Sequence, residues 1–198
     1  MVFTTAPPAA YVIIFNVELM KLASDILLNI MVTLYNVISS DGFIARKDGG
    51  EDFIPDNLWP NFLNLCREYG ALIMGRKTHD TIQNYDKELL QPFEELPIRK
   101  IVISGKRGFL PKKEYIVAYS PKDALALAPD ALVSSGPTLN NFLLKNGMVK
   151  KIILHQIPVS IGEGIKPFDT NGISLIPIGE TAKLEGVRVY EYSVVNNL

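Results

Sequence analysis

One stretch decides the fold: residues 71–78 read ALIMGRKT. Its first four residues are all apolar, as expected of a short strand that is buried on both faces of a sheet. Gly75 has no side chain, so a ligand can approach the backbone closely there. Arg76, Lys77 and Thr78 then begin a short helix. A buried strand that leads directly into a helix is typical of a parallel α/β sheet.

The same alternation continues on both sides of this stretch. Apolar residues at 58, 62, 65 and 69 predict a helix before it. Further strands are predicted at residues 32–38, 99–104, 115–119, 131–134 and 151–157, and further helices start near residues 120 and 138. From residue 173 onward the chain is strand-like, with Glu185 and Gly186 as a hairpin turn. We therefore predict an α/β fold with a mainly parallel central sheet, helices on both faces and an antiparallel C-terminal hairpin.

The composition favours a single domain without a metal or nucleic acid. Of 198 residues, 47% are apolar and 21% are charged, which is enough for one core of ordinary size. The net charge is −1, and Lys and Arg form no long run, so we expect no nucleic-acid-binding surface. Cys66 is the only cysteine, which excludes an internal disulfide and a cysteine-built metal site. A reducing, cytoplasmic location fits best.

The first thirty residues differ in character from the rest. The apolar run from Tyr11 to Val17 is short, contains Asn16 and follows no cationic residue, so it does not resemble a secretory signal. It is also much shorter than the roughly 20 apolar residues that cross a bilayer, so we expect no membrane partner. We interpret residues 1–30 as an extension, either loosely attached or translated from a start upstream of Met31, and residues 31–198 as the functional domain. The alternative is that this segment docks on the domain or on a partner protein.

Two strand-to-helix junctions have the chemistry of a phosphate site. In parallel α/β sheets, ligands bind beyond the carboxyl ends of the strands, where helix N-termini present free N–H groups. The first junction runs from Gly75 to Thr78, and the second, with small residues, runs from Ser134 to Leu139. Local chemistry also allows a solvated helix start at the first junction and a tight packing turn at the second. Neither has the spacing of the Rossmann or Walker motifs.

Five segments resemble one superfamily of reductases. Residues 75–82 (GRKTHDTI) are similar to the cofactor-binding loop and helix of dihydrofolate reductases. The segments similar to the reductase domain of the bifunctional riboflavin-pathway deaminase-reductase are 40–45 (SDGFIA), 135–139 with 142–144, 147–149 and 158–164 (PVSIGEG). The resemblance covers about residues 31–195 and implies a dihydrofolate-reductase-like fold with NADPH as the cofactor.

The resemblance also implies which residues contact NADPH. Around the phosphates, including the 2′-phosphate, it places Gly75, Arg76, Lys77 and Thr78, and beside the adenosine it places Ser104. Along the pyrophosphate and the nicotinamide ribose it places Ser135, Gly136, Pro137, Thr138 and Leu139. Beside the nicotinamide it places Val37, Ile44 and Ala45. These positions agree with the two junctions that helix-end electrostatics predicts.

On the substrate side, the sequence departs from both families. Dihydrofolate reductases carry an acidic residue at the start of the helix after the first strand, where this chain has Asn57 with Asp56 beside it. Riboflavin-pathway reductases usually carry one where this chain has Ser134. We predict that Asn57, Ser134 and Trp59 contact the substrate, although Trp59 is equally suited to anchor the helix start.

Two carboxylates remain as predicted catalytic proton donors, with a bound water as a third source. Asp41 lies nearest to the expected pocket, and Asp56 is the second candidate. Asp41 is equally suited to cap the turn at Gly42.

These features predict a reductase of the riboflavin-pathway type, which transfers hydride from NADPH to a ribosylated aminopyrimidine phosphate. One alternative is a dihydrofolate or other pteridine reductase. An alternative of another class is a nucleotide-binding protein without turnover. The riboflavin-type relatives also suggest a homodimer.

Overall fold

The computed structural model describes residues 31–111, 114–184 and 186–196, so the expected extension and Glu185 of the predicted hairpin turn lie outside the described residues. The strands are β1 (Val32–Ile38), β2 (Ala71–Gly75), β3 (Arg99–Ile103), β4 (Tyr115–Ala118), β5 (Leu132–Val133), β6 (Val149–Gln156), β7 (Ile173–Leu184) and β8 (Val187–Asn196). The helices are the short 3₁₀ helix η1 (Asp56–Leu58), α2 (Trp59–Tyr69), α3 (Arg76–Gln83), α4 (Lys87–Glu94), α5 (Pro121–Leu127) and α6 (Pro137–Lys145).

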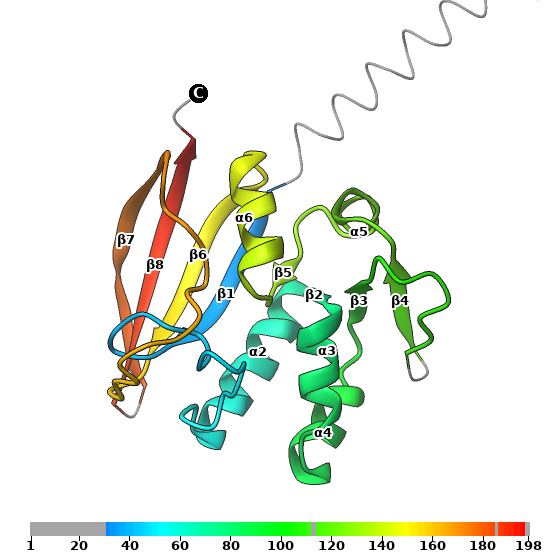
Figure 1. Ribbon diagram of the computed structural model, residues 1–198, viewed down its shortest axis with the longest axis horizontal. Helices are drawn as coiled ribbons and strands as arrows, with labels where there is room; N and C mark the ends of the chain where they lie inside the picture. The colour runs from blue at the N-terminus through cyan, green and yellow to red at the C-terminus, as the bar shows by residue number, and fades with distance from the viewer. Residues whose placement is uncertain (1–30, 112–113, 185, 197–198) are drawn as a thin grey trace, which may run out of the picture. The chain divides into compact units, whose positions relative to one another are not determined.

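These strands form one sheet in the order β4-β3-β2-β5-β1-β6-β8-β7. The pairs from β4 to β6 are parallel, whereas β8 runs antiparallel to β6 and β7 runs antiparallel to β8. Figure 1 shows the hairpin of β7 and β8 at one edge of the sheet and β4 at the other. The predicted α/β fold, with a mainly parallel sheet and an antiparallel C-terminal hairpin, is confirmed.

Helices cover both faces of the sheet, as predicted. The connections through α2, α3 and α4 move along the sheet from β1 to β3, whereas those through α5 and α6 move back from β4 to β6. Because parallel crossovers are right-handed, the two sets lie on opposite faces. Adjacent residues of β1 show both faces: the Tyr35 ring stacks on Phe62 of α2 at 5.4 Å, and Asn36 bonds to Asn140 of α6. We call these the α2 face and the α6 face.

The pattern of apolar residues does not reveal α4. Its sequence KELLQPFE contains Pro92, which usually ends a helix, and the side chain that it buries is Phe93. Trp59 at the start of α2 holds α4 in place, because its Nε1 donates to the Leu89 carbonyl at 2.7 Å and its ring contacts the Phe93 ring. α4 is therefore specified by tertiary contacts more than by its own periodicity.

Candidate functional site

The two strand-to-helix junctions lie side by side at the carboxyl edge of the sheet. β2 and β5 pair in parallel, and the Ser134 N–H donates to the Ile73 carbonyl at 3.1 Å. A Cβ atom built on Gly75 would stand 3.0 Å from Ser135 Oγ. The junctions at Gly75 and Gly136 therefore belong to one site.

Both helices that begin here have free backbone donors. α3 follows Gly75 and α6 follows Gly136, and neither glycine has a side chain to cap the first N–H groups. Pro137 has no N–H, so the donors of α6 begin at Thr138. A Cβ atom on Gly136 would meet no atom within 4 Å, so the space beside the start of α6 is open. Two neighbouring helix N-termini create a partial positive charge that favours phosphate oxygens.

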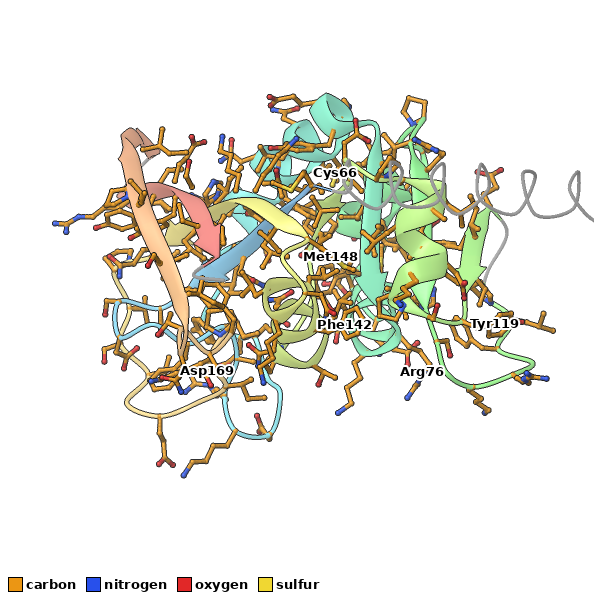
Figure 2. The ribbon with its side chains drawn as sticks, turned by 90° about the horizontal axis from the view of Figure 1, so that it is seen from above. Cys66, Arg76, Tyr119, Phe142, Met148 and Asp169 are labelled. Atoms are coloured by element: carbon orange, nitrogen blue, oxygen red, sulfur yellow. The ribbon has the colours of Figure 1, made fainter. Side chains whose placement is uncertain are left out.

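Basic side chains add to this positive charge at the first junction. Arg76 forms an ion pair with Asp80 one turn further along α3, with Nη1 and Oδ2 2.6 Å apart, and it remains about half exposed. Lys77 is exposed and Thr78 is partly buried. Figure 2 shows Arg76 at the same end of the sheet as Tyr119, away from Cys66. Each group thus stands where the sequence predicts a phosphate-binding side chain, and the phosphate contacts themselves stay a prediction.

Two further basic residues, which the sequence did not predict as site residues, follow the end of β3 at this edge. β3 ends beside β2, with Ile103 opposite Gly75. Ser104, the next residue, is buried, and its Oγ accepts a hydrogen bond from the Lys106 N–H at 3.2 Å. Lys106 and Arg107 are exposed in this loop. The predicted end of the strand at Ser104 was the signal that would have pointed to them.

Two buried asparagines fix the second junction, and the sequence analysis missed both. Nδ2 of Asn36 and Nδ2 of Asn140 each donate to the Ser135 carbonyl at 3.0 Å, and Asn140 also donates to the Pro167 carbonyl at 2.9 Å. Oδ1 of Asn140 is buried without a hydrogen-bond donor among the described residues. Such an acceptor is costly unless a bound molecule supplies a donor. Asn36 could have been noticed, because it interrupts an otherwise apolar stretch of β1.

The residues predicted to flank the nicotinamide lie where two loops pair. The Ile165 N–H donates to the Ala45 carbonyl and the Ile44 N–H donates to the Ile165 carbonyl, both at 2.8 Å. Ala45 is buried by this pairing, and Ile44 is partly buried. Val37, near the end of β1, packs against the apolar cluster that contains Phe53 and Ile157. The loop after β1 is thus fastened to the loop after β6 beside the end of β1.

Gly164 is required for this loop pairing, and replacing it with alanine should destabilise the fold. A Cβ atom there would stand 2.3 Å from the backbone oxygen of Ala45 and 3.1 Å from Cβ of Phe43. The backbone cannot move aside as a side chain does, so we expect a loss of about 2 kcal/mol in the free energy of unfolding. Denaturant unfolding measures the loss. Gly105→Ala is the control, because a Cβ atom there meets nothing within 4 Å; equal losses in both variants would contradict the prediction.

Asp41 joins the same two loops. Its carboxylate accepts hydrogen bonds from the hydroxyls of Ser39 and Ser160 and from the N–H groups of Ile161 and Gly162. These donors, with Ser39 contributing most, hold the pKa of the Asp41 carboxyl well below its usual range. A carboxyl that stays ionised at neutral pH has no proton to deliver. Asp41 therefore binds the loop at residues 160–162, whereas the Gly42 N–H donates to the Ser39 carbonyl. Its catalytic role stays a prediction.

The other predicted substrate-side residues are spread over two elements. Asp56 and Asn57 are exposed in η1, and Ser134 lies at the second junction. Trp59 is partly buried, and its ring lies 5.1 Å from the Phe62 ring. Since its Nε1 is bonded to a carbonyl of α4, Trp59 has the anchoring role that the sequence left open.

A partly buried carboxyl that the sequence analysis missed lies close to Trp59. Oε2 of Glu51 stands 3.5 Å from the Tyr85 hydroxyl, and the Tyr85 ring contacts the Trp59 ring at 5.2 Å. Burial raises the pKa of the Glu51 carboxyl. In the sequence nothing separates Glu51 from Asp52 beside it, because both stand in one polar loop.

An open cleft of about 630 Å³ lies beside the second junction, on the α6 face. Its walls come from β1, β6, β7 and β8, from α6 and from the loop at residues 165–170. The large apolar and aromatic side chains among them are Leu154, Phe168, Leu175 and Tyr192. It meets the predicted site at Asp41 and Pro137. Trp59, which belongs to the α2 face, does not line this cleft.

In the parts of the chain that the structure describes, no group of three or more His, Cys, Asp or Glu side chains is placed to hold a metal ion. No helix in those parts is long and apolar enough to cross a membrane.

No protein-family model and no curated protein matches the chain, but solved structures do. A protein from Shewanella sp. PV-4 named for riboflavin biosynthesis has a TM-score of 0.67 and 19% identity, over 84% of this chain and 99% of that chain. A diaminohydroxyphosphoribosylaminopyrimidine deaminase/5-amino-6-(5-phosphoribosylamino)uracil reductase from Thermotoga maritima has a TM-score of 0.58 and 16% identity, over 83% of this chain. Dihydrofolate reductase from Enterococcus faecalis, complexed with NADP(H), has a TM-score of 0.55 and 17% identity, over 84% of this chain and 95% of that chain.

The similarity to these proteins is structural and extends over the body of the chain. The chain spans 56% of the length of the Thermotoga protein, whose printed name includes two activities. The other two matches are covered almost end to end. The chain therefore has the dihydrofolate-reductase-like fold that the resemblance predicted.

Proposed function

We propose that residues 31–198 form an NADPH-dependent reductase that acts on a pyrimidine or pterin ring system. The observation that carries this proposal is the placement of two uncapped helix N-termini side by side, with Gly75 at one and Gly136 at the other. One phosphate group needs only one such helix end, whereas a dinucleotide has several phosphate oxygens to satisfy. Arg76 and Lys77 at the first helix end supply the matching positive charge.

The residues present fit NADPH well. Arg76, Lys77 and Thr78 would hold phosphate oxygens at the first junction, and Ser104 would contact the adenosine. Ser135 and the residues up to Leu139 would line the pyrophosphate and nicotinamide ribose, with Val37, Ile44 and Ala45 beside the nicotinamide. The buried Oδ1 of Asn140 is an acceptor that a ligand or water donor would satisfy. When bound, NADPH supplies a hydride, while the protein orients the reactants and excludes water.

Two substrate classes follow from the structural relatives. The Thermotoga protein's name refers to a phosphoribosylaminouracil, which supports our first choice, a ribosylated aminopyrimidine phosphate. The Enterococcus protein is a dihydrofolate reductase, which supports the alternative, a pteridine. The first of these classes carries a phosphate. A substrate panel should therefore contain each pyrimidine with and without its phosphate.

Replacing Arg76 with alanine should weaken NADPH binding about 10-fold, because a charge-assisted contact to a phosphate is lost. Titration calorimetry with NADPH measures the change. Arg67→Ala is the matched control, since Arg67 is exposed in α2 and bonds to Asn64 of the same helix. Equal affinities in the wild-type protein and the Arg76 variant would argue against the assigned phosphate site.

Turnover is tested by NADPH absorbance with the substrate panel. Oxidation that requires a pyrimidine or a pterin supports the reductase. Tight NADPH binding without oxidation across both substrate classes would instead support the nucleotide-binding protein without turnover. Failure to bind NADPH at all would overturn the proposed function.

A further inference from the structure

The cleft on the α6 face has an apolar floor that three neighbouring strands supply. Leu154 of β6 lies directly opposite Asn36 of β1 and therefore shares its α6 face. Tyr192 of β8 and Leu175 of β7 continue the floor, and both are partly exposed, whereas Leu154 is buried. The wall of the cleft is the loop at residues 165–170, which we call the cleft loop. The floor thus offers an aromatic ring and an aliphatic side chain that a ligand can cover.

The cleft loop is fastened to α6, so the shape of the cleft is set before any ligand arrives. Nδ2 of Asn140 donates to the Pro167 carbonyl at 2.9 Å, and the Asp169 N–H donates to Oδ1 of Asn141 at 2.8 Å. Phe168 lies between these two attachments and is buried. A wall held by such bonds needs little ordering when a ligand binds, which favours affinity.

Three charged side chains line the cleft, and two of them are already bonded. The carboxylate of Asp41 accepts hydrogen bonds from the two loops that it joins. Oδ1 and Oδ2 of Asp169 accept hydrogen bonds from the N–H and Nδ2 of Asn171, at 3.0 Å and 3.2 Å. Lys166 is exposed and has no ion pair or hydrogen bond with any residue that the structure describes. Lys166 is therefore the charge that a ligand can engage.

The uncharged polar groups of the lining add hydrogen-bond donors. Asn141 uses Oδ1 to accept the Asp169 N–H, so the polar atom that it leaves to a ligand is Nδ2, a donor. Thr170 and Tyr192 add hydroxyl groups. An acidic group in the cleft would therefore meet one cation and these donors, whereas a basic group would meet carboxylates that are already bonded.

We propose that this cleft binds a small aromatic anion, a flat ring that carries a carboxylate or a phosphate. The ring packs against Tyr192 and Leu175, and the acidic group lies beside Lys166. Apolar burial of the ring supplies affinity, and the charge-assisted contact selects an anion. The volume of about 630 Å³ is within the range of small-molecule sites. This site goes beyond the proposed function and does not need NADPH to be bound.

Two fluorescent probes that differ in one charged group test the proposal on the full chain. One is 8-anilinonaphthalene-1-sulfonate, and the other is N-phenyl-1-naphthylamine, which has the same rings without the sulfonate. Both become fluorescent in apolar surroundings, so titration with the protein gives both affinities. Lys166→Gln should weaken binding of the sulfonate about 10-fold and leave the neutral probe unchanged. Tyr192→Ala should weaken binding of both, because the ring loses its main contact.

Two further variants control for charge elsewhere on the protein. Lys122→Gln removes the same charge from an exposed position on α5, and Arg76→Ala removes a cation from the dinucleotide site. Both should bind the sulfonate as the wild-type protein does, and thermal unfolding shows whether each variant is folded. Equal affinity of the wild-type protein and Lys166→Gln for the sulfonate would overturn the proposal. Weaker binding in Arg76→Ala alone would place the probe at the dinucleotide site and would also overturn it.

The mass in solution tests a different occupant, a second copy of this chain. If a second copy covers the cleft, Tyr192→Ala should convert a dimer into a monomer, and the wild-type dimer should bind neither probe. That combination would identify an interface between copies and would overturn the ligand site.

Two kinds of molecule have the proposed chemistry, namely the phosphorylated substrate of the proposed reductase and a separate metabolite. Competitive inhibition by the sulfonate against the substrate that the panel identifies would support the aromatic-anion site and name the substrate as its occupant. Sulfonate binding that leaves KM unchanged would support the site and assign it to a separate metabolite. Absence of NADPH oxidation would overturn the proposed function alone, because the probe titrations need neither NADPH nor substrate.

Discussion

Replacing Gly136 with valine should lower the affinity for NADPH by at least about 100-fold while the protein stays folded. Gly136 has φ −85° and ψ −179°, an extended conformation that any residue adopts, and a Cβ atom there meets nothing within 4 Å. Valine therefore fits the backbone and fills the space beside the start of α6. That space is where we place the pyrophosphate, so the larger side chain excludes the ligand from the N–H groups.

Two measurements separate a blocked site from a damaged fold. Calorimetric titration reports NADPH affinity, and thermal unfolding reports stability. Lys145→Val is the control, because it introduces the same side chain at an exposed position in the last turn of α6. Wild-type affinity in the Gly136 variant would show that the dinucleotide does not bind beside the start of α6. A loss of both affinity and stability would contradict our account of Gly136 as an unstrained position.

Acidification from pH 6.5 to pH 4 should cost the fold about 3 kcal/mol through His155 alone. His155 is buried in β6, and burial lowers its pKa from 6.5 to about 4. Between these two pH values the unfolded chain binds a proton at His155 and the folded chain does not. The unfolded state is therefore stabilised as the pH falls, and the free energy of unfolding decreases until the folded protein also takes up the proton, near pH 4.

His155→Gln isolates this contribution. The Tyr35 hydroxyl lies 3.2 Å from Nδ1 of His155, and a glutamine side chain retains a polar partner for that hydroxyl without titrating. Urea unfolding of both proteins across this range should give a difference that grows as the pH rises from 4 to 6.5 and is constant above it. A difference independent of pH would mean that His155 is protonated to the same extent in the folded and unfolded chains.

Both junctions of the candidate site can be predicted from sequence, because each combines an apolar strand with a short glycine-containing turn. Residues 71–74 end at Gly75 and residues 131–133 lead to Gly136, and the paired strands then bring the two turns together. The parallel arrangement decides which ends of the strands meet, and the alternation of strands and helices already indicates that arrangement. The sequence also shows directly that two basic residues, Arg76 and Lys77, follow Gly75 at the start of the helix.

Contacts between distant segments explain what the sequence could not show. The donors that keep Asp41 ionised include Ser160, which is 119 residues away in the chain. Trp59 bonds to Leu89, in a helix without a clear apolar pattern. Glu51 differs from Asp52 because Tyr85 and the surrounding packing reach it from another part of the chain. A side chain's protonation depends on such neighbours, so protonation states are harder to predict than phosphate-binding turns.

The central place of β1 has a consequence for how the polypeptide is made. β1 is the first strand of the described chain, yet Leu34 pairs with Val133 on one side and Ile152 on the other. A growing chain on the ribosome therefore carries this apolar strand without either neighbour while residues 39–131 are being added. Pairing across such long separations also makes folding slow, so the nascent protein depends on protection from aggregation until β6 has emerged.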